Sequence, residues 1–290
     1  ELDDNNKPIA LYVKQRKDAH LLVEDFMLLA NRSVAAFISK KSEGAEIPFV
    51  YRVHDEPNPE KLADFASFAA ELGYKDMKID TPKQIAASFN KLSKEAKTNE
   101  LFKMLEPLAI RTMAKAEYTT DNIGHYGLAF KDYTHFTSPI RRYSDVLVHR
   151  LLEKNIYTSF RTDKAKLEAE CQHISAQERK AMKAERESIK YKQVEYIESK
   201  IGEEFEGIVS GIIDRGIFVE LKASKAEGMI SFAELNDSFD TSKSRYKAIG
   251  QRTGQVYKMG DTIKVKILDA DLDAAKEKAK FVKQTLQIIS

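Results

Sequence analysis

Helix-forming patterns dominate the first two hundred residues of the chain. Apolar side chains recur there every three or four positions, which is typical of amphipathic helices. The expected helices span residues 21–40, 58–72, 81–92, 99–118 and 163–200. Shorter alternating or aromatic segments predict strands at residues 9–13, 47–54 and 125–130. This part of the chain is therefore expected to be helix-rich α+β.

The pattern changes near Ile201, where short alternating segments replace the helices. Gly211 permits a bend, and residues 214–216 form a tight-turn sequence between two expected strands. Two strands are expected within residues 204–221, on either side of that turn, and three more at residues 227–232, 263–268 and 278–282. Five short strands are the number in a Greek-key OB barrel. We therefore expect two domains, residues 1–200 and an all-β OB fold at 201–290.

Two adjacent arginines follow a predicted helix start. Ser138 is a favoured N-cap residue, and Pro139 fits the first helical position, so Arg141 and Arg142 are expected in the first helical turn. A helix N-terminus prefers anions, so arginines there indicate a shared phosphate. The alternative is that one arginine simply pairs with Asp145. The aromatic residues flanking this pair favour a nucleic-acid site; they are Tyr126, Tyr133, His135, Phe136 and Tyr143.

Composition limits the classes of function. The net charge of +2 and pI of about 8.4 are only weakly basic, so nucleic-acid affinity has to come from local patches. The single cysteine, Cys171, excludes an internal disulfide framework and indicates a reducing, cytoplasmic location. No stretch is typical of a membrane span or a signal peptide, so we expect no membrane partner.

The sequence of residues 133–152, YTHFTSPIRRYSDVLVHRLL, resembles the signature of the ribonuclease II and ribonuclease R (RNB) exoribonuclease family. Within that family the resemblance is greatest to ribonuclease R. It implies a processive hydrolase that degrades single-stranded RNA from the 3′ end to nucleoside 5′-monophosphates. It also implies Mg²⁺ held by an aspartate cluster.

The resemblance also implies roles for individual residues. Arg141 would be catalytic, holding the scissile or neighbouring phosphate, and residues 23–35 resemble a family helix in which Glu24 contacts the nucleotide near the 3′ end. Solvation or pairing with His20 is the alternative for Glu24, and surface ion pairing is the alternative for Glu185. The RNA-binding residues expected in this part of the chain are Glu24, Asn31, Tyr133, Ser138, Arg142, Tyr143 and Glu185.

Residues 201–290 resemble the S1-type OB-fold RNA-binding domain. Phe218 keeps one aromatic residue of the family's stacking face, and Phe205 is a candidate for a second. Arg215 stands where the family often has an aromatic residue, but a guanidinium plane can also stack on a base. Residues 236–259 are expected to form a basic and aromatic loop, which suits either a single-strand funnel or simple solubility.

No metal ligand is expected in this chain. The family's aspartate cluster lies before the helix that residues 23–35 resemble, and Asp3 and Asp4 lie in a turn instead. We therefore expect the Mg²⁺ ligands upstream and the chain alone to be inactive. The alternative is a non-catalytic RNA-binding or adaptor protein; a DNA-binding protein is disfavoured. Expected partners are the 3′ end of single-stranded RNA and, for the parent protein, the ribosome or RNA-decay factors.

Overall fold

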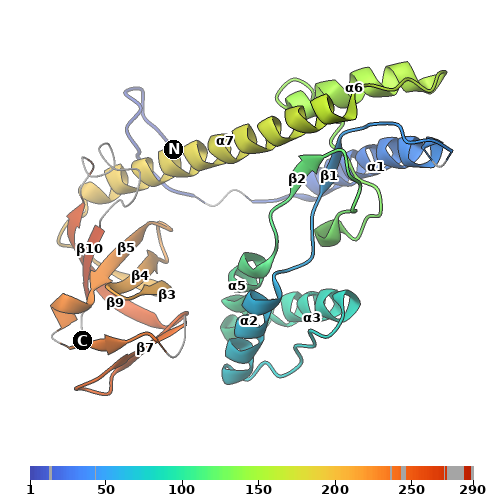
Figure 1. The fold of residues 1–290 in the computed structure, drawn as a ribbon. Coiled ribbons are helices and arrows are strands. Elements are labelled where there is room, and N and C mark those ends of the chain that lie inside the picture. The colour runs from blue at the N-terminus through green and yellow to red at the C-terminus, as the bar shows by residue number, and fades with distance from the viewer. Residues whose placement is uncertain are drawn as a thin grey trace. The chain divides into compact units, whose positions relative to one another are not determined.

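The computed structural model describes residues 1–12, 15–42, 44–235, 237–242, 246–270, 272 and 284–288 (Figure 1). The chain divides into two compact units. We call residues 15–97 with 105–182 the helical unit, and residues 1–14, 98–104 and 183–290 the barrel unit. Within the described residues, no helix is both long enough and apolar enough to cross a membrane.

The helical unit contains a hydrophobic core to which residues 35–53, 118, 147–151 and 167–171 contribute. Its elements are α1 (Asp18–Lys41), β1 (Tyr51–Val53), α2 (Pro59–Glu71), α3 (Pro82–Glu95), α5 (Leu105–Thr112), β2 (Glu117–Thr119), the 3-10 helix η1 (Tyr126–Leu128), α6 (Tyr143–Ile156) and the first part of α7 (Lys164–Glu198). The strands β1 and β2 pair antiparallel, with Arg52 opposite Tyr118. The core includes Ala35, Ile38, Phe49, Val50, Val53, Leu147, Val148, Leu151 and Cys171.

The predicted starts of α2 and α3 are confirmed. The Asn58 side chain accepts a hydrogen bond from the Lys61 N–H at 3.0 Å, and Thr81 accepts one from the Gln84 N–H at 3.3 Å. A proline follows each cap at the first helical position. Gly73, with φ of +91°, follows the end of α2. These boundaries depend on neighbouring residues only, so the sequence contains what is needed to place them.

The expected helix over residues 99–118 is wrong. The segment forms α4 (Glu100–Lys103), then α5, and then β2. Pro107 has no N–H to donate to the carbonyl of Lys103, so one helix cannot continue through this point. Beyond α5, the Tyr118 N–H donates to the Ser175 hydroxyl of α7 at 2.9 Å, which holds Tyr118 in a strand.

Two expected strands are shorter than predicted. Residues 9–12 form no strand, although Leu2 and Pro8 make an isolated bridge; Val13 lies outside the described residues. Within residues 47–54, only β1 pairs as a regular strand. The apolar residues that predicted α1 lie mostly on an exposed face, and the helix buries Asn31, Ala35 and Ile38 instead.

The barrel unit confirms the expected OB architecture. Its strands β3 (Glu204–Ile213), β4 (Gly216–Leu221), β5 (Glu227–Ser231), β9 (Thr262–Ala270) and β10 (Gln284–Ile288) form a closed barrel in the order β10-β5-β4-β3-β9. The strand β10 runs parallel to β5 and antiparallel to β9. The strand expected at residues 278–282 lies outside the described residues, and β10 closes the barrel.

The described residues of the expected loop over 236–259 form a small sheet. The 3-10 helix η2 (Phe232–Leu235) leads to β6 (Phe239–Asp240), β7 (Lys247–Gly250) and β8 (Val256–Lys258), which pair antiparallel in that order. Phe239 stacks on Phe232 with ring centroids 4.4 Å apart, so the segment packs against the barrel core. Two of its expected cations, Lys243 and Arg245, lie outside the described residues.

Candidate nucleic-acid interface

The arginine pair lies in a turn that precedes α6. The N–H groups of Arg141 and Arg142 both donate to the Ser138 carbonyl, at 3.3 and 3.0 Å, and the backbone at Arg142 is extended. The helix begins only at Tyr143, so the prediction that both arginines lie in its first turn is wrong. We call residues 138–142 the arginine turn.

Asp145 holds this turn in place and was missed as a site residue. Its side chain is fully buried. The carboxylate accepts hydrogen bonds from the Ser138 N–H at 2.7 Å, Arg142 Nη2 at 2.9 Å and the Ser144 hydroxyl at 3.1 Å. The first of these bonds ties Ser138 to α6, because Asp145 lies in the first turn of that helix. The spacing of Arg142 and Asp145, three residues apart, was the available signal.

The two arginines therefore differ in what they can do. The Arg142 side chain is only 17% exposed and is paired with Asp145, which is the alternative raised from the sequence. Arg141 is exposed, as are its neighbours Ile140 and Tyr143. Two buried atoms, Thr137 Oγ1 and Arg142 Nε, have no hydrogen-bond partner among the described residues. Arg141 is thus the guanidinium that is presented to solvent.

Asn31 joins α1 to the loop that leads into the arginine turn. Its side-chain amide donates to the Tyr133 hydroxyl at 3.1 Å and accepts from the Phe136 N–H at 2.9 Å. Asn31 and Tyr133 are both buried. Their observed contacts hold the loop, and direct RNA contact by either residue stays a prediction.

The expected strand over residues 125–130 is wrong, because this segment forms η1. The His125 imidazole Nδ1 accepts the Leu128 N–H at 3.2 Å and so caps the 3-10 turn. Ala129 then adopts a left-handed conformation with φ of +54°. His125 also stacks on His54, with ring centroids 5.1 Å apart.

Beneath the turn lies a neutral histidine surrounded by guanidiniums. His135 Nδ1 and the Tyr118 hydroxyl are 2.7 Å apart and share a hydrogen bond. Burial, together with the smaller effect of the charges of Arg142, Arg52 and Arg141, lowers the pKa of His135 to about 2. Because His135 stays neutral, the positive charge at this surface comes from the arginines.

Arg52 is the second residue that sequence reasoning missed. Its guanidinium lies over the Tyr118 ring, 4.6 Å from the centroid, and donates to Glu178 Oε2 of α7 at 2.7 Å. The Arg52 N–H also donates to the Tyr133 carbonyl at 2.9 Å. Arg52 thereby ties β1 to the loop before the arginine turn. The partner Glu178 is 126 positions away, so no local pattern indicated the pair.

Glu24 lies on the exposed surface of α1 and pairs with Arg16 rather than with His20. His20 instead accepts the Lys17 N–H at 3.1 Å and caps the helix. The remaining predicted residues lie in the barrel unit. Glu185 is exposed on α7, Arg215 is exposed in the turn between β3 and β4, and Phe218 is half-buried on β4. The structure therefore gathers Asn31, Tyr133, Ser138, Arg141, Arg142 and Tyr143 around one loop.

An OB barrel joined by a long helix to a unit with an exposed arginine turn indicates a protein that binds single-stranded nucleic acid. Comparison with family models identifies the two parts: residues 1–158 match the RNB domain, and residues 198–276 match the S1 RNA binding domain. The chain belongs to the RNB-domain family.

Named relatives agree with this assignment. The chain is 36% identical to Ribonuclease R of Aquifex aeolicus over 288 residues, which covers 98% of the chain and 40% of the relative. It is 37% identical to Ribonuclease R of Thermotoga maritima over 277 residues, covering 93% of the chain and 38% of the relative. The chain thus spans about 40% of the length of these relatives.

A solved structure gives the same result for the fold. Mycoplasma genitalium RNase R, in complex with ribose methylated single-stranded RNA, superposes with a TM-score of 0.87 at 29% identity. The match covers 99% of this chain and 44% of that one.

Proposed function

We propose that this chain forms the RNA-holding part of a hydrolytic 3′-to-5′ exoribonuclease that degrades single-stranded RNA to nucleoside 5′-monophosphates. The observation that carries the proposal is the exposed Arg141 on a turn that Asp145 fixes from inside. A guanidinium held in this way can bind a backbone phosphate and stabilise the charge that develops during hydrolysis.

The surroundings of Arg141 support phosphate binding. The charges of Arg52 and Arg142, like that of Arg141, lower the pKa of His135, so the three guanidiniums lie near one another. Their positive charges add up at this surface. Arg52 and Arg142 are both paired with carboxylates, so their geometry is fixed before RNA arrives. We propose that Arg142 and Ser138 position Arg141, while the exposed Tyr143 contacts the strand.

Single-stranded RNA is the partner that these observations favour. A relative with the same fold was solved with a single-stranded RNA, and the second half of the chain matches an RNA-binding domain. In the proposed complex, Glu24 and Glu185 contact the strand along with Arg215 and Phe218. We place the functional boundary near residue 200, between the end of α7 and the start of β3, and the protein in the cytoplasm.

The residues that the structure describes do not fit the magnesium site of a phosphodiesterase. Among the described residues, no three His, Cys, Asp or Glu side chains are grouped to hold a metal ion. The buried carboxylate nearest the arginine turn, Asp145, already accepts from Ser138, Arg142 and Ser144. We therefore propose that Mg²⁺ is bound by residues outside this chain, and that the chain binds RNA without shortening it.

The test is a binding and degradation assay of the chain with a 5′-labelled single-stranded RNA, with Mg²⁺ and with EDTA. Binding without shortening is expected. Arg141→Ala should weaken binding about tenfold, the loss of one charge-assisted contact. Arg150→Ala is the matched control, since Arg150 is exposed on α6 and its removal changes the net charge equally. Equal affinities for the two variants would refute the role of Arg141.

The alternative is an RNA-binding adaptor that never hydrolyses RNA. If the longer protein is an enzyme, Arg141→Ala in that protein should lower turnover more than RNA affinity, because the guanidinium acts mainly on the transition state. If it is an adaptor, the wild type should show no turnover, and Arg141→Ala should change the RNA affinity alone.

A further inference from the structure

A series of hydrogen bonds leads from the arginine turn into the helical unit. Asp145, which fixes the turn, accepts from the Ser144 hydroxyl at 3.1 Å. Ser144 is also hydrogen bonded to the Tyr118 hydroxyl, which lies 2.7 Å from His135 Nδ1. We call these four side chains the relay. The relay joins a buried carboxylate on α6 to an imidazole in the loop before the arginine turn.

The direction of the relay follows from its charged end. The Asp145 carboxylate can only accept, so Ser144 donates to it and keeps its own oxygen as an acceptor. Tyr118 then donates to Ser144, and the Tyr118 oxygen accepts from His135. The single proton of the neutral imidazole is therefore on Nδ1, and Nε2 keeps a lone pair.

The Nε2 atom of His135 is an acceptor that reaches the solvent. Among the residues that the structure describes, His135 makes its side-chain hydrogen bond through Nδ1 alone. His135 is half-buried, yet Nε2 is not one of the buried atoms without a partner, a set that includes Thr137 Oγ1 and Arg142 Nε. An exposed lone pair at a surface where guanidiniums gather is placed to accept from a ligand that those cations attract.

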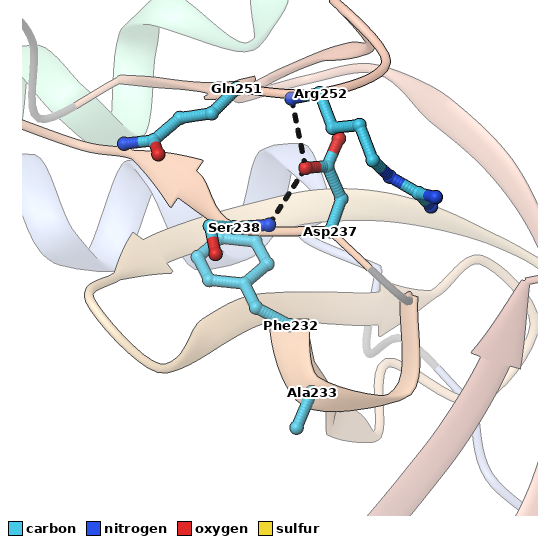
Figure 2. A pocket seen from close by; sticks show the side chains of 6 residues that line it. All are labelled: Phe232, Ala233, Asp237, Ser238, Gln251 and Arg252. Carbon is cyan, nitrogen blue, oxygen red and sulfur yellow. Dashed lines mark hydrogen bonds between the residues drawn. The ribbon is translucent and has the colours of Figure 1, made fainter.

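A carboxylate in the barrel unit shows the opposite arrangement. Asp237 lines a cavity of about 500 Å³ beside η2. Figure 2 shows its hydrogen bonds to the N–H groups of Ser238 and Arg252, at 2.7 and 3.0 Å. The N–H and the hydroxyl of Thr253 also donate to it. These bonds hold the turn of residues 250–253 and occupy the acceptor, whereas the relay ends in an acceptor that no described residue uses.

The RNA group that suits this acceptor is the ribose 2′-hydroxyl. A lone pair requires a hydrogen-bond donor, and the ionised phosphate of the backbone has none. Base edges carry donors, but these differ from one base to the next. Every RNA nucleotide has a 2′-hydroxyl, and DNA lacks it. The charge of Arg141 acts on His135, so the two side chains lie near each other and can meet one nucleotide.

We propose that His135 is a specificity-determining residue for RNA over DNA: its Nε2 accepts the 2′-hydroxyl of a nucleotide whose phosphate Arg141 binds. Tyr118 and Ser144 are positioning residues, because they hold the imidazole proton on Nδ1 and so keep Nε2 as an acceptor. The inference rests on the proposed function, since the strand is the one that the chain is proposed to hold. It adds a contact that recognises the sugar and not the base sequence.

The first test changes the ligand and leaves the protein intact. The full chain is titrated with a fluorescein-labelled oligouridine and with its 2′-fluoro analogue, which keeps an RNA-like sugar but cannot donate a hydrogen bond. The 2′-fluoro strand should bind about fivefold more weakly, because one neutral hydrogen bond is lost. Equal affinities for the two strands would overturn the proposal. If the chain binds no oligouridine at all, the proposed function is refuted with it.

The variant His135→Phe tests whether the lost bond belongs to this side chain. It keeps a flat ring without an acceptor, so the two strands should bind it with nearly equal affinity. His149→Phe is the matched control, since the Nε2 atom of that imidazole is already 2.8 Å from the Phe136 carbonyl oxygen. The control should keep the preference for oligouridine. If His135→Phe also keeps it while Arg141→Ala still weakens binding, the role of His135 is refuted and the proposed function stands.

A spectroscopic test addresses the positioning residues. Nitrogen-15 NMR distinguishes the two imidazole tautomers, and the His135 signals are those missing from His135→Phe; they should show the proton on Nδ1. Tyr118→Phe keeps the ring below the Arg52 guanidinium, 4.6 Å from the centroid, but removes the hydroxyl. The proton should then be shared between both nitrogens, and the preference for oligouridine should fall. A proton on Nε2 in the wild type, or an unchanged tautomer in Tyr118→Phe, would refute the relay.

Discussion

The two units of this protein each present an arginine on a turn that an aspartate holds, yet they do so in different surroundings. In the helical unit, Asp145 is fully buried and accepts from a guanidinium as well as from a backbone N–H. In the barrel unit, Asp237 lies nearer the surface and accepts from three N–H groups and a hydroxyl, all neutral donors. The same device therefore depends on a charge pair in one unit and on backbone dipoles in the other.

This difference should determine how much stability each unit loses when its aspartate is changed. A buried carboxylate paired with Arg142 cannot be removed without leaving an uncompensated charge inside the fold. A carboxylate near the surface can be replaced by water if its hydrogen bonds are lost. We expect changes at Asp145 to affect the stability of the helical unit, and changes at Asp237 to affect only the turn beside it.

The largest expected effect is that of Asp145→Asn. The amide keeps the shape and one acceptor but leaves Arg142 buried without its negative partner. The free energy of unfolding of the helical unit should fall by about 3 kcal/mol. Urea denaturation followed by hydrogen exchange, read separately for peptides of the two units, measures this loss.

Glu153→Gln on the same helix provides the control, because Glu153 is exposed on α6. The helical unit of that variant should have the same free energy of unfolding as in the wild type. If the peptides of the barrel unit lose as much protection as those of the helical unit in Asp145→Asn, the units do not fail separately and the comparison is wrong.

The next expected effect is that of acid, which should destabilise the helical unit at a higher pH than the barrel unit. Burial lowers the pKa of His125 from its ordinary value of 6.5 to about 4, so the folded helical unit resists taking up a proton that the unfolded chain accepts. Stability from this group is complete above pH 6.5 and is lost as the pH falls toward 4, by about 2 kcal/mol after allowing for solvent screening. His135, whose pKa is lowered to about 2 mainly by burial, adds a loss that begins at the same pH of 6.5 and continues to lower pH.

The barrel unit should respond only in stronger acid. The hydrogen bond from Thr253, with the neighbouring N–H groups, lowers the pKa of Asp237 from 3.8 to about 2, so its contribution persists above pH 3.8 and disappears as the pH falls through 2. Hydrogen exchange between pH 6.5 and 4 should therefore show weakening of the helical unit first.

A variant at His125 sharpens this test. His125→Asn retains an acceptor for the Leu128 N–H but cannot take up a proton, so it should reduce the pH dependence of the helical unit to the part that comes from His135 and His54. The exposed His173 on α7, changed to Asn, should leave that dependence as it is. An acid response in His125→Asn that is as steep as in the wild type would contradict the assignment.

What the sequence could predict follows the same division between local and distant contacts. The starts of α2 and α3 were predictable, because Asn58 and Thr81 cap N–H groups only three residues away. The barrel was predictable, since alternation along each strand reflects its own burial. The segment 236–259 was not, because the stacking of Phe239 on Phe232 decides its structure.

The arginine turn shows why the site was only partly predictable. Ser138, Arg141 and Arg142 were identified by residue type and spacing, but their conformation depends on a bond from the Ser138 N–H to Asp145 that a helix pattern does not contain. Arg52 could not be found at all, because its partner Glu178 and its neighbour Tyr118 are distant in sequence. The residue types of the site could be identified from the sequence, but the contacts that orient these residues could be seen only in the folded structure.

The smallest expected effect is that of Asp237→Asn, and it tests whether the surface turn is only a local device. The amide still accepts one set of hydrogen bonds but supplies no charge, so the N–H groups of Arg252 and Thr253 should exchange several-fold faster. The thermal midpoint of the barrel unit should stay close to that of the wild type, since its core of Val209, Ile217, Val219 and Ile230 is untouched. Glu234→Gln, an equal charge change on the exposed side of η2, should alter neither quantity. A large fall in the midpoint for Asp237→Asn would mean that this carboxylate, like Asp145, stabilises its whole unit. The two aspartates would then differ in burial but not in their contribution to stability.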